Sequence, residues 1–177
     1  MVRHIEKSEF SEGVSGLEEK NWLQLMTEQT QLAKVLKTNA YTEKFGLVLS
    51  EDEAELLVTD RRDSLQEQRR VEFGEGILPK LIFTFCDSPY IYQDNYVDTI
   101  GSLQDIFYLY KNESLDEVTD DELLEFMKEQ FDGLCEGDLE QLEGTALEQF
   151  ARDIRMKTHH FMSKQNTPIK WEPEEDE

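Results

Sequence analysis

The sequence predicts an all-α protein that forms a single bundle-like domain of about six helices. Three observations support this fold class. Apolar residues recur at steps of three and four over several segments, as they do on one face of a helix. Ser or Thr followed three residues later by Glu, the pattern of an N-terminal capping box, occurs three times. Glycine or proline stands where several of these segments end.

The chain begins with a segment that lacks sustained periodicity. Residues 1–16 contain Ser, Gly and Glu and are predicted to form a mobile leader, and residues 17–160 are predicted to form the helical domain. The first helix is indicated by apolar residues that share one helical stripe, namely Trp22, Leu25, Met26, Leu32, Ala33 and Leu36. Residues 45–49 are interpreted as a short extended segment before the next helix.

A capping box marks the start of the next helix. The Ser50 hydroxyl can accept the amide of Glu53 while the glutamate reaches back to Ser50. Cations suit the C-terminal end of a helix, and four lie toward the end of this one: Arg61, Arg62, Arg69 and Arg70. Gly74 and Gly76 then predict a turn.

Two apolar helices are predicted in the middle of the chain. Residues 77–85 are nearly all apolar, and Pro79 falls in the first turn, where its missing amide hydrogen is tolerated. Asp87, Ser88 and Pro89 end this helix, because the residue before proline is forced out of the α region. The following helix has the most regular spacing in the chain, through Tyr96, Ile100, Leu103, Phe107 and Tyr110.

Two further capping boxes are predicted in the last third of the chain. Thr119 and Glu122 precede a helix that Gly133 is placed to end. Its apolar residues are Leu123, Leu124, Met127 and Phe131. Thr145 and Glu148 are interpreted as the start of the last helix, after a short turn.

The charge of the chain is strongly acidic and localised. The formal net charge is −22, and residues 112–150 contribute −13 of it, with 14 acidic residues against the single basic residue Lys128. Such a surface does not neutralise phosphates or anionic headgroups, so we expect no direct nucleic-acid binding and no membrane binding. Residues 161–177 are predicted to form a flexible acidic tail, because five of the last six residues are acidic.

Cysteine usage and the N-terminus predict a cytoplasmic location. Cys86 and Cys135 are isolated, as is typical of a reducing compartment, and Cys135 is expected to be the more exposed because glycines lie near it. The first ten residues lack the apolar core of a signal peptide. The longest apolar-rich stretch, residues 77–86, is too short to span a bilayer.

The sequence contains no recognisable catalytic, metal or cofactor motif. His4, His159 and His160 are its only histidines, and none is part of a Glu-x-x-His pair. The acidic residues lack the spacing and glycine of an EF-hand, and phosphate-binding loops are absent. We therefore predict no catalytic residue, no metal ligand and no cofactor, and weak adsorption of calcium or magnesium stays open.

An interaction surface is predicted where tyrosines and acidic residues gather. Eight of the 18 aromatic residues lie between Phe83 and Tyr110, and tyrosine suits boundaries that are apolar on one side and wet on the other. Coverage of these tyrosines by neighbouring helices is the alternative. The candidate surface consists of Tyr90, Tyr92, Tyr108, Asp116, Glu117, Asp120 and Asp121.

Residues 45–155 resemble an uncharacterised bacterial family, a domain of unknown function found in small acidic proteins. Three runs carry the resemblance: VEFGEGILPKLIFTFCDSPYI, FYLYKNESLDEVTDDELLEFM and FDGLCEGDLEQLEGTALEQ. The resemblance implies membership of a family and no mechanism.

The leading functional hypothesis is a non-catalytic interaction or adaptor protein whose partner is a protein with a basic or mixed surface. One alternative is a small-molecule binder or enzyme with a pocket lined by Tyr90, Tyr92 and Tyr96. Another is an acidic mimic of nucleic acid, whose carboxylates would need phosphate-like spacing. The oligomeric state and the partner stay open.

Overall fold

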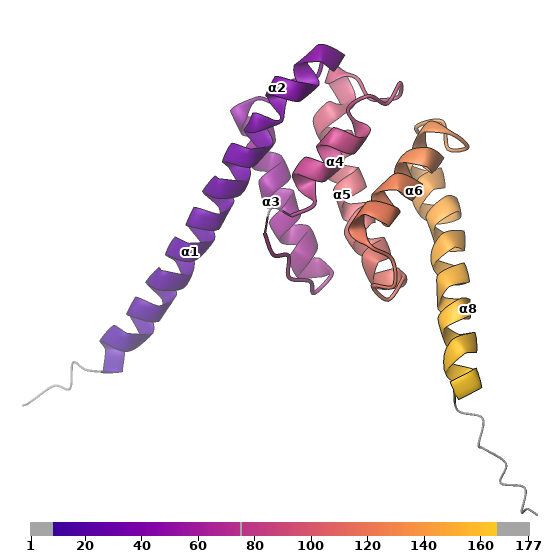
Figure 1. The fold of residues 1–177 in the computed structure, drawn as a ribbon. Coiled ribbons are helices and arrows are strands. Elements are labelled where there is room, and N and C mark those ends of the chain that lie inside the picture. Colours follow the sequence, from indigo (N-terminus) through magenta and orange to yellow (C-terminus); the bar gives the residue numbers. More distant parts are fainter. Residues whose placement is uncertain (1–8, 75, 166–177) are drawn as a thin grey trace, which may run out of the picture. The chain divides into compact units, whose positions relative to one another are not determined.

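The computed structural model describes residues 9–74 and 76–165 of the chain (Figure 1). Within these residues every regular element is a helix, and no strand occurs. Eight α-helices follow one another there, of which α2 has four residues and α7 three, so six longer helices remain. The predicted all-α class and the prediction of about six helices are confirmed.

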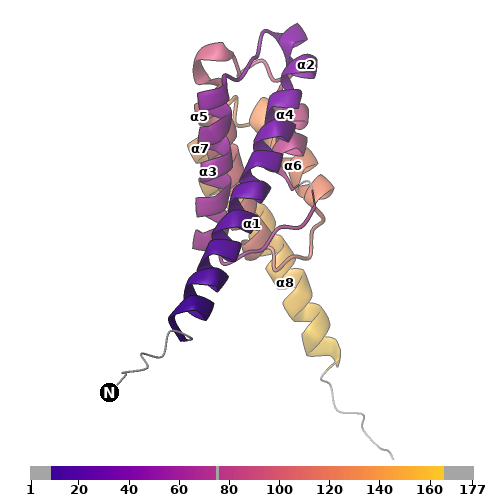
Figure 2. The same cartoon turned by 90° about the vertical axis from the view of Figure 1, so that its left-hand side faces the viewer.

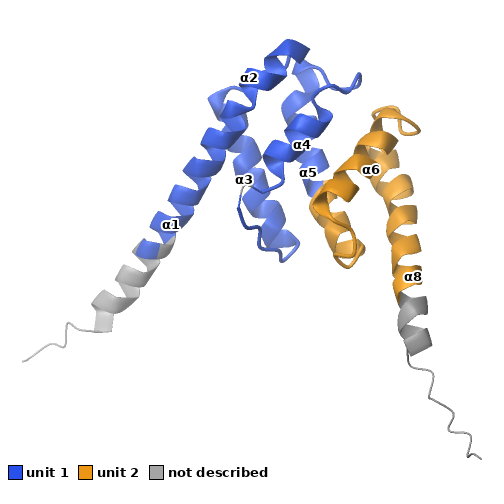
Figure 3. Ribbon diagram, viewed as in Figure 1, with its two compact units in different colours: residues 1–105 blue, residues 106–177 orange. Residues whose placement is uncertain are grey.

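The chain divides into two compact units, residues 1–105 and 106–177 (Figure 3). Unit 1 contains α1 (Glu9–Lys37), α2 (Asn39–Thr42), the 3-10 helix η1 (Glu43–Phe45), α3 (Glu51–Glu67), α4 (Leu78–Phe85) and the 3-10 helix η2 (Gln93–Asn95). Helix α5 (Tyr96–Glu113) contributes residues to both units. Unit 2 continues with α6 (Asp120–Asp132), α7 (Leu139–Gln141), the π-helical segment η3 (Leu142–Leu147) and α8 (Glu148–Gln165).

Helix α1 packs against α3 within unit 1 (Figures 1 and 2). The side chains that it buries are Gln31 and Val35, which are 3% and 0% exposed. The predicted apolar stripe lies roughly 120° around the helix axis from Val35. Trp22 and Leu25, on that stripe, are 61% and 47% exposed. Leu32 and Leu36 of the same stripe are half-buried, so the helix was predicted and only the C-terminal part of its apolar stripe packs.

The ends of the described chain differ from the predicted domain boundaries. Helix α1 begins at Glu9, inside the predicted leader, and α8 ends at Gln165. Residues 1–8 and most of the predicted tail, residues 166–177, lie outside the described residues.

Helices α3 and α5 follow the sequence pattern closely. The Ser50 hydroxyl accepts the Glu53 amide at 3.2 Å, and the Glu53 carboxylate accepts the Ser50 amide at 2.8 Å, so the predicted capping box is present. On α5 all five predicted core residues are at most 3% exposed: Tyr96, Ile100, Leu103, Phe107 and Tyr110. The predicted stripe of α5 is confirmed as a buried face.

The segment before α3 begins with a turn at Gly46 and continues through residues 47–50 without regular secondary structure. Phe45 ends η1, and Gly46 has a φ of 76°, the left-handed conformation that glycine adopts without strain. Leu47 and Leu49 then alternate toward the core, at 1% and 2% exposed. The alternation explains why the sequence suggested an extended segment, although no sheet pairs with it in the described residues.

In unit 2 one of the two predicted capping boxes is present. Thr119 and Glu122 cap α6 reciprocally, at 3.2 and 3.0 Å, and Gly133 follows the end of the helix. The box at Thr145 is wrong, because Thr145 lies inside continuous helical backbone in η3. The cap is Asp138, whose carboxylate accepts the amides two and three residues later at 2.9 and 3.1 Å.

Candidate interaction surfaces

Three exposed aromatic rings meet on the surface of unit 1. Tyr41, Phe45 and Phe83 are 43%, 41% and 47% exposed. The ring centroids of Tyr41 and Phe45 are 5.9 Å apart, and those of Tyr41 and Phe83 are 5.2 Å apart. We call these three rings, together with Lys44, the aromatic patch.

Local structure fixes the three rings. Tyr41 and Phe45 are one helical turn apart, on α2 and η1. Between them, the fully buried Thr42 hydroxyl donates to the Leu47 carbonyl at 2.7 Å and holds the turn in place. Phe83 lies on the outer side of α4, whose other large apolar side chains are buried. The patch is therefore built from backbone segments that are themselves anchored.

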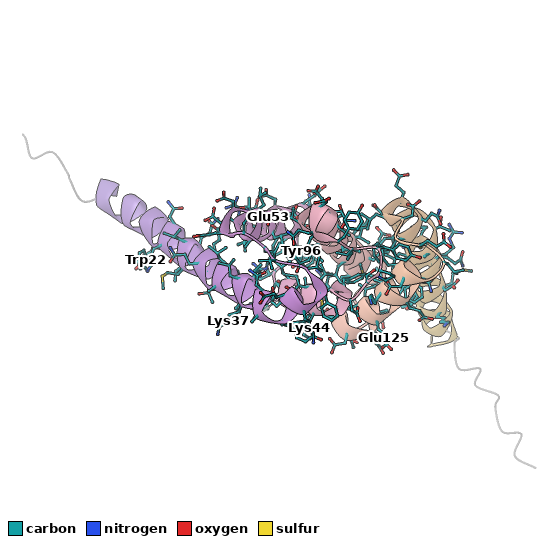
Figure 4. All side chains as sticks on the ribbon, turned by 90° about the horizontal axis from the view of Figure 1, so that it is seen from above. Trp22, Lys37, Lys44, Glu53, Tyr96 and Glu125 are labelled. Atoms are coloured by element: carbon teal, nitrogen blue, oxygen red, sulfur yellow. The ribbon has the colours of Figure 1, made fainter. Side chains whose placement is uncertain are left out.

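A cation lies over the patch. The Lys44 ammonium nitrogen is 3.9 Å from the Tyr41 ring centroid and 5.2 Å from the Phe45 ring centroid, within the range of a cation–π interaction. In Figure 4 Lys44 lies at the outside of unit 1, whereas Tyr96 lies among interior side chains. An otherwise strongly acidic chain thus presents an aromatic surface with a positive charge.

The predicted tyrosines have three different environments. Tyr92 is 59% exposed, Tyr90 is half-buried, and Tyr108 is 2% exposed. The loop that carries Tyr92 is fixed to the loop after the patch, because the Gln93 side chain bonds both backbone groups of Val48, at 2.9 and 2.8 Å. Tyr92 is thus an exposed tyrosine, while the buried side chain of Tyr108 is not part of the surface.

The predicted acidic residues lie in the turn before α6 and in the first turn of that helix, in unit 2. Asp116, Glu117, Asp120 and Asp121 are all exposed. The ammonium group of Lys111, which is 7% exposed, is 2.9 Å from an Asp120 carboxylate oxygen and 3.9 Å from one of Asp116. Two of these carboxylates therefore pair with a buried cation of their own unit.

A groove with an aromatic centre lies between α6 and the η3–α8 segment of unit 2. The rings of Phe126 and Phe150 stack with centroids 4.2 Å apart and planes 18° apart. Two hollows, of about 390 and 380 Å³, adjoin the stack, and both are lined by these two rings. The larger hollow also contains Leu134, Ala146 and Asp153 in its wall.

Polar atoms beneath this groove are satisfied or buried. The Tyr110 hydroxyl donates to the Glu143 carbonyl, which lies in the widened turn of η3. Burial is the first cause that raises the pKa of Tyr110 to about 12.

The thiol of Cys135 is buried. Cys135 is only 4% exposed, so the expectation of an exposed thiol is wrong. Burial, and then the charge of Asp138, raise the pKa of this thiol. Its low exposure and raised pKa make Cys135 a poor nucleophile.

Two carboxyl groups approach one another in unit 1. Partial loss of hydration at the carboxyl group, and then the neighbouring Asp60 carboxylate, raise the pKa of Asp105 from 3.8 to about 6, although the residue as a whole is exposed. Asp60 also accepts a hydrogen bond from the buried Gln104 amide at 2.9 Å. Both causes disfavour the charged form of Asp105 in the folded protein.

We expect Asp105→Asn to stabilise the protein at pH 7.5. The folded pKa exceeds the unfolded one, so stability falls as the pH rises from about 4 to about 6 and the penalty remains above that window. The gain is about 1 kcal/mol, because Asp105 is exposed and its charge is partly screened. Thermal melts of Asp105→Asn and of the exposed control Glu55→Gln would show it. An equal gain at pH 4 and pH 7.5 would contradict the assignment.

The described residues form neither a metal-binding cluster nor a helix able to span a membrane. In the part of the chain that the structure describes, no three His, Cys, Asp or Glu side chains group to hold a metal ion. The side chains of His4, His159 and His160 lie outside that part. None of the described helices is both long and apolar enough to cross a membrane.

The family of the chain follows from a comparison with protein families. Residues 34–160 match the model of DUF6323, a family of unknown function, over most of the chain. The chain belongs to this family. No curated protein and no solved structure matches the chain. The predicted membership of a family of unknown function is confirmed. The DUF6323 match crosses the boundary between the two units and includes the aromatic patch and the groove.

Sequence reasoning missed the rings that form both surfaces. Tyr41 and Phe45 are an i, i+4 aromatic pair with Lys44 beside them, a signal that was present in the sequence. Phe83 and Phe126 each lie within a helix that also carries a buried apolar face, so their own exposure required the structure. Within the DUF6323 region these rings contact one another at the surface, whereas the predicted tyrosines have three different environments.

Proposed function

We propose that this DUF6323 protein is a non-catalytic protein-binding protein, and that the aromatic patch of unit 1 contacts the partner. The observation that carries the proposal is the ring contact of Tyr41, Phe45 and Phe83, each more than 40% exposed, beneath the Lys44 ammonium group. The partner surface is mixed: apolar opposite the rings, with a carboxylate or carbonyl opposite Lys44.

The composition of the patch is that of an interface centre. Tyrosine and phenylalanine are enriched in the cores of protein interfaces, because they bury a large area while few torsions become fixed. The rings are already held in contact, so less side-chain entropy is lost when a partner covers them. An isolated exposed ring would need no such explanation, but here the Tyr41 ring contacts both the Phe45 and the Phe83 ring, so the three form one apolar patch.

The exposures of the tyrosines favour this role over a ligand pocket. Tyr96 is fully buried and Tyr92 is 59% exposed, so these two side chains do not line one accessible pocket. The nucleic-acid mimic needs a continuous row of carboxylates, whereas the patch is aromatic and carries a cation. The proposal accordingly rests on the patch and not on the acidity of the chain.

The test compares two exposed phenylalanines of unit 1. Phe45 belongs to the patch, while Phe73, which is 86% exposed, lies in the loop that follows the opposite end of α3. We expect Phe45→Ser to reduce binding to the partner about tenfold, as for one residue of an interface centre, and Phe73→Ser to leave it unchanged.

Each variant is used for affinity purification from the native cell at moderate salt, and the bound proteins are identified by mass spectrometry. A partner of the patch is a protein that binds to wild type and to Phe73→Ser but not to Phe45→Ser. Isothermal titration of the purified pair would then measure the ratio of dissociation constants. Circular dichroism of the three proteins checks that the fold is unchanged. Equal recovery with Phe45→Ser, or no protein above background for wild type, would refute the role of the patch.

A further inference from the structure

The groove of unit 2 offers a second surface, with a chemistry different from that of the aromatic patch. Its centre is the stacked pair Phe126 and Phe150, which come from α6 and α8 and line both hollows. Both rings are half-buried, so each still presents a face to solvent. The two hollows adjoin at these rings, so the groove has an aromatic centre with a hollow beside it in each case.

The larger hollow is mainly apolar with amide groups at its edge. Leu134 is 84% exposed and stands at the wall beside Ala146 and the buried Cys135. Such an exposed leucine next to stacked rings is an apolar anchor for another chain. The amide-bearing side chains in this wall are Gln130, Gln141 and Gln149. These amides can bond a polar group without a fixed charge.

The second hollow carries a row of carboxylates. Its wall contains Glu122, Glu125 and Glu129, which are all exposed and lie on α6 at steps of three and four residues. Residues at these steps share one face of a helix, at intervals of about 4.5 and 6 Å along its axis. The carboxylate of Glu122 already caps α6, so Glu125 and Glu129 are the two rim charges to consider for a partner.

The charge of the residues around the groove indicates whether a basic or an acidic partner is attracted to it. The residues that line the groove lie between positions 118 and 153, where 12 acidic residues stand against two basic ones. Both basic side chains lie near carboxylates of unit 2: Lys128 is 2.7 Å from Asp132, and Arg152 is 3.8 Å from Glu148. An acidic or nucleic-acid partner would meet repulsion here, whereas a cationic partner is steered toward the groove.

We propose that this groove binds a basic amphipathic helix. Its apolar face lies on the Phe126 and Phe150 rings, and its Lys or Arg residues, spaced one turn apart, face Glu125 and Glu129. Helical spacing of the rim carboxylates matches helical spacing of the cations, and an apolar groove is a common docking surface for the apolar face of such a helix. The inference stands apart from the aromatic patch, because it uses residues of unit 2 alone.

The probe is a synthetic 18-residue peptide of Leu and Lys with the leucines on one helical face, and binding is measured by fluorescence anisotropy with the full chain. The rim variant is Glu125→Gln with Glu129→Gln. The matched control is Glu117→Gln with Glu140→Gln, which removes the same charge from exposed positions of unit 2 outside the groove. A peptide with Glu in place of Lys, and one with the same residues in scrambled order, test sign and amphipathicity.

We expect the rim variant to weaken binding of the Leu-Lys peptide by about three- to tenfold, and the control variant to weaken it less than twofold. Phe126→Ser should weaken it by about tenfold or more if its melting temperature shows that it folds. Hydrogen exchange of wild type should show protection by the peptide in α6 and α8. The scrambled and acidic peptides should not bind.

Equal weakening by the rim and control variants would show general attraction to an acidic surface and would overturn the proposal. So would equal binding of the scrambled peptide, or protection outside α6 and α8. Phe45→Ser, in the aromatic patch, should bind the peptide as wild type does. The two proposals can therefore fail separately. If no partner depends on Phe45 but the peptide binds the groove as expected, only the role of the aromatic patch is refuted. If a partner depends on Phe45 but the peptide does not bind the groove, only the groove proposal is refuted.

Discussion

Arg61→Met is expected to lower the free energy of unfolding by about 3 to 5 kcal/mol. Arg61 is 8% exposed, and its Nε is 2.7 Å from a Glu72 carboxylate oxygen. The two side chains are only 10% and 14% exposed, so water screens this ion pair little. Removing the guanidinium leaves the Glu72 carboxylate in a poorly hydrated place without that cation. Urea denaturation followed by circular dichroism would measure the loss.

The neighbouring residue provides the control. Arg62 pairs with Glu28 at 2.8 Å, but the two side chains are 37% and 31% exposed. We expect Arg62→Met to cost less than about 1 kcal/mol, as exposed pairs do. The double variant Arg61→Met with Glu72→Met should recover much of the loss, because no carboxylate is then left behind. Similar losses for Arg61→Met and Arg62→Met would contradict this account.

The same ion pair affects the surface of unit 1. A side chain at Gly76 would place its Cβ 2.2 Å from the Glu72 carboxylate, and Gly76 has a φ of +75°. The loop thus closes around the Arg61 and Glu72 pair and leads directly into α4. Because α4 carries Phe83, the loss of this pair should also disturb the aromatic patch.

Helices defined by local interactions could be predicted from the sequence. The capping boxes at Ser50 and Thr119 involve side chains and amides three residues apart, so the sequence contains all their parts. The α5 stripe is buried in full because a regular spacing leaves one continuous apolar face. The predicted capping box at Thr145 is wrong because the helical backbone already begins after the Asp138 cap, seven residues earlier.

The face of α1 could not be predicted, because packing depends on the neighbouring element. Periodicity locates the apolar residues of a helix but does not say which face meets a partner. In α1 the polar side chain of Gln31 is buried against the rest of unit 1. Trp22 is exposed, and Figure 4 shows it on the outer part of the helix. Trp22 also lies outside the residues that match DUF6323.

The candidate surface was predicted in part. Tyr92 and the acidic residues before α6 are exposed, as a surface requires. Tyr108 was a candidate for the surface, with coverage by neighbouring helices as the alternative, and its 2% exposure agrees with the alternative. A long helix can be covered on more than one side, and composition alone does not report this. The groove joins residues 24 positions apart, Phe126 and Phe150, which only the tertiary structure brings together.

Lys111→Met is expected to lower the free energy of unfolding by about 2 to 3 kcal/mol. The buried ammonium group donates to the Val118 carbonyl at 2.6 Å and pairs with Asp120 at 2.9 Å. Methionine replaces the alkyl stem but leaves that carbonyl without its charged donor. The loop also contains Leu115 and Asp116, both with a φ of 56°, which L residues rarely adopt without support from their surroundings. Hydrogen exchange at residues 114–119 and urea denaturation would measure the effect.

Lys128→Met removes the same charge from unit 2 and is the matched control. Lys128 forms an i, i+4 pair with Asp132, for which we expect a loss of about 0.5 kcal/mol. If Lys111 closes the loop, Lys111→Met alone should raise the exchange rate of the Asp116 amide, which donates to the Lys111 carbonyl at 3.0 Å. Equal exchange in the two variants would mean that the loop holds its left-handed residues without the ammonium group. A faster exchange in Lys111→Met alone would assign the pairing of Asp120 with Lys111 to the stability of the turn before α6.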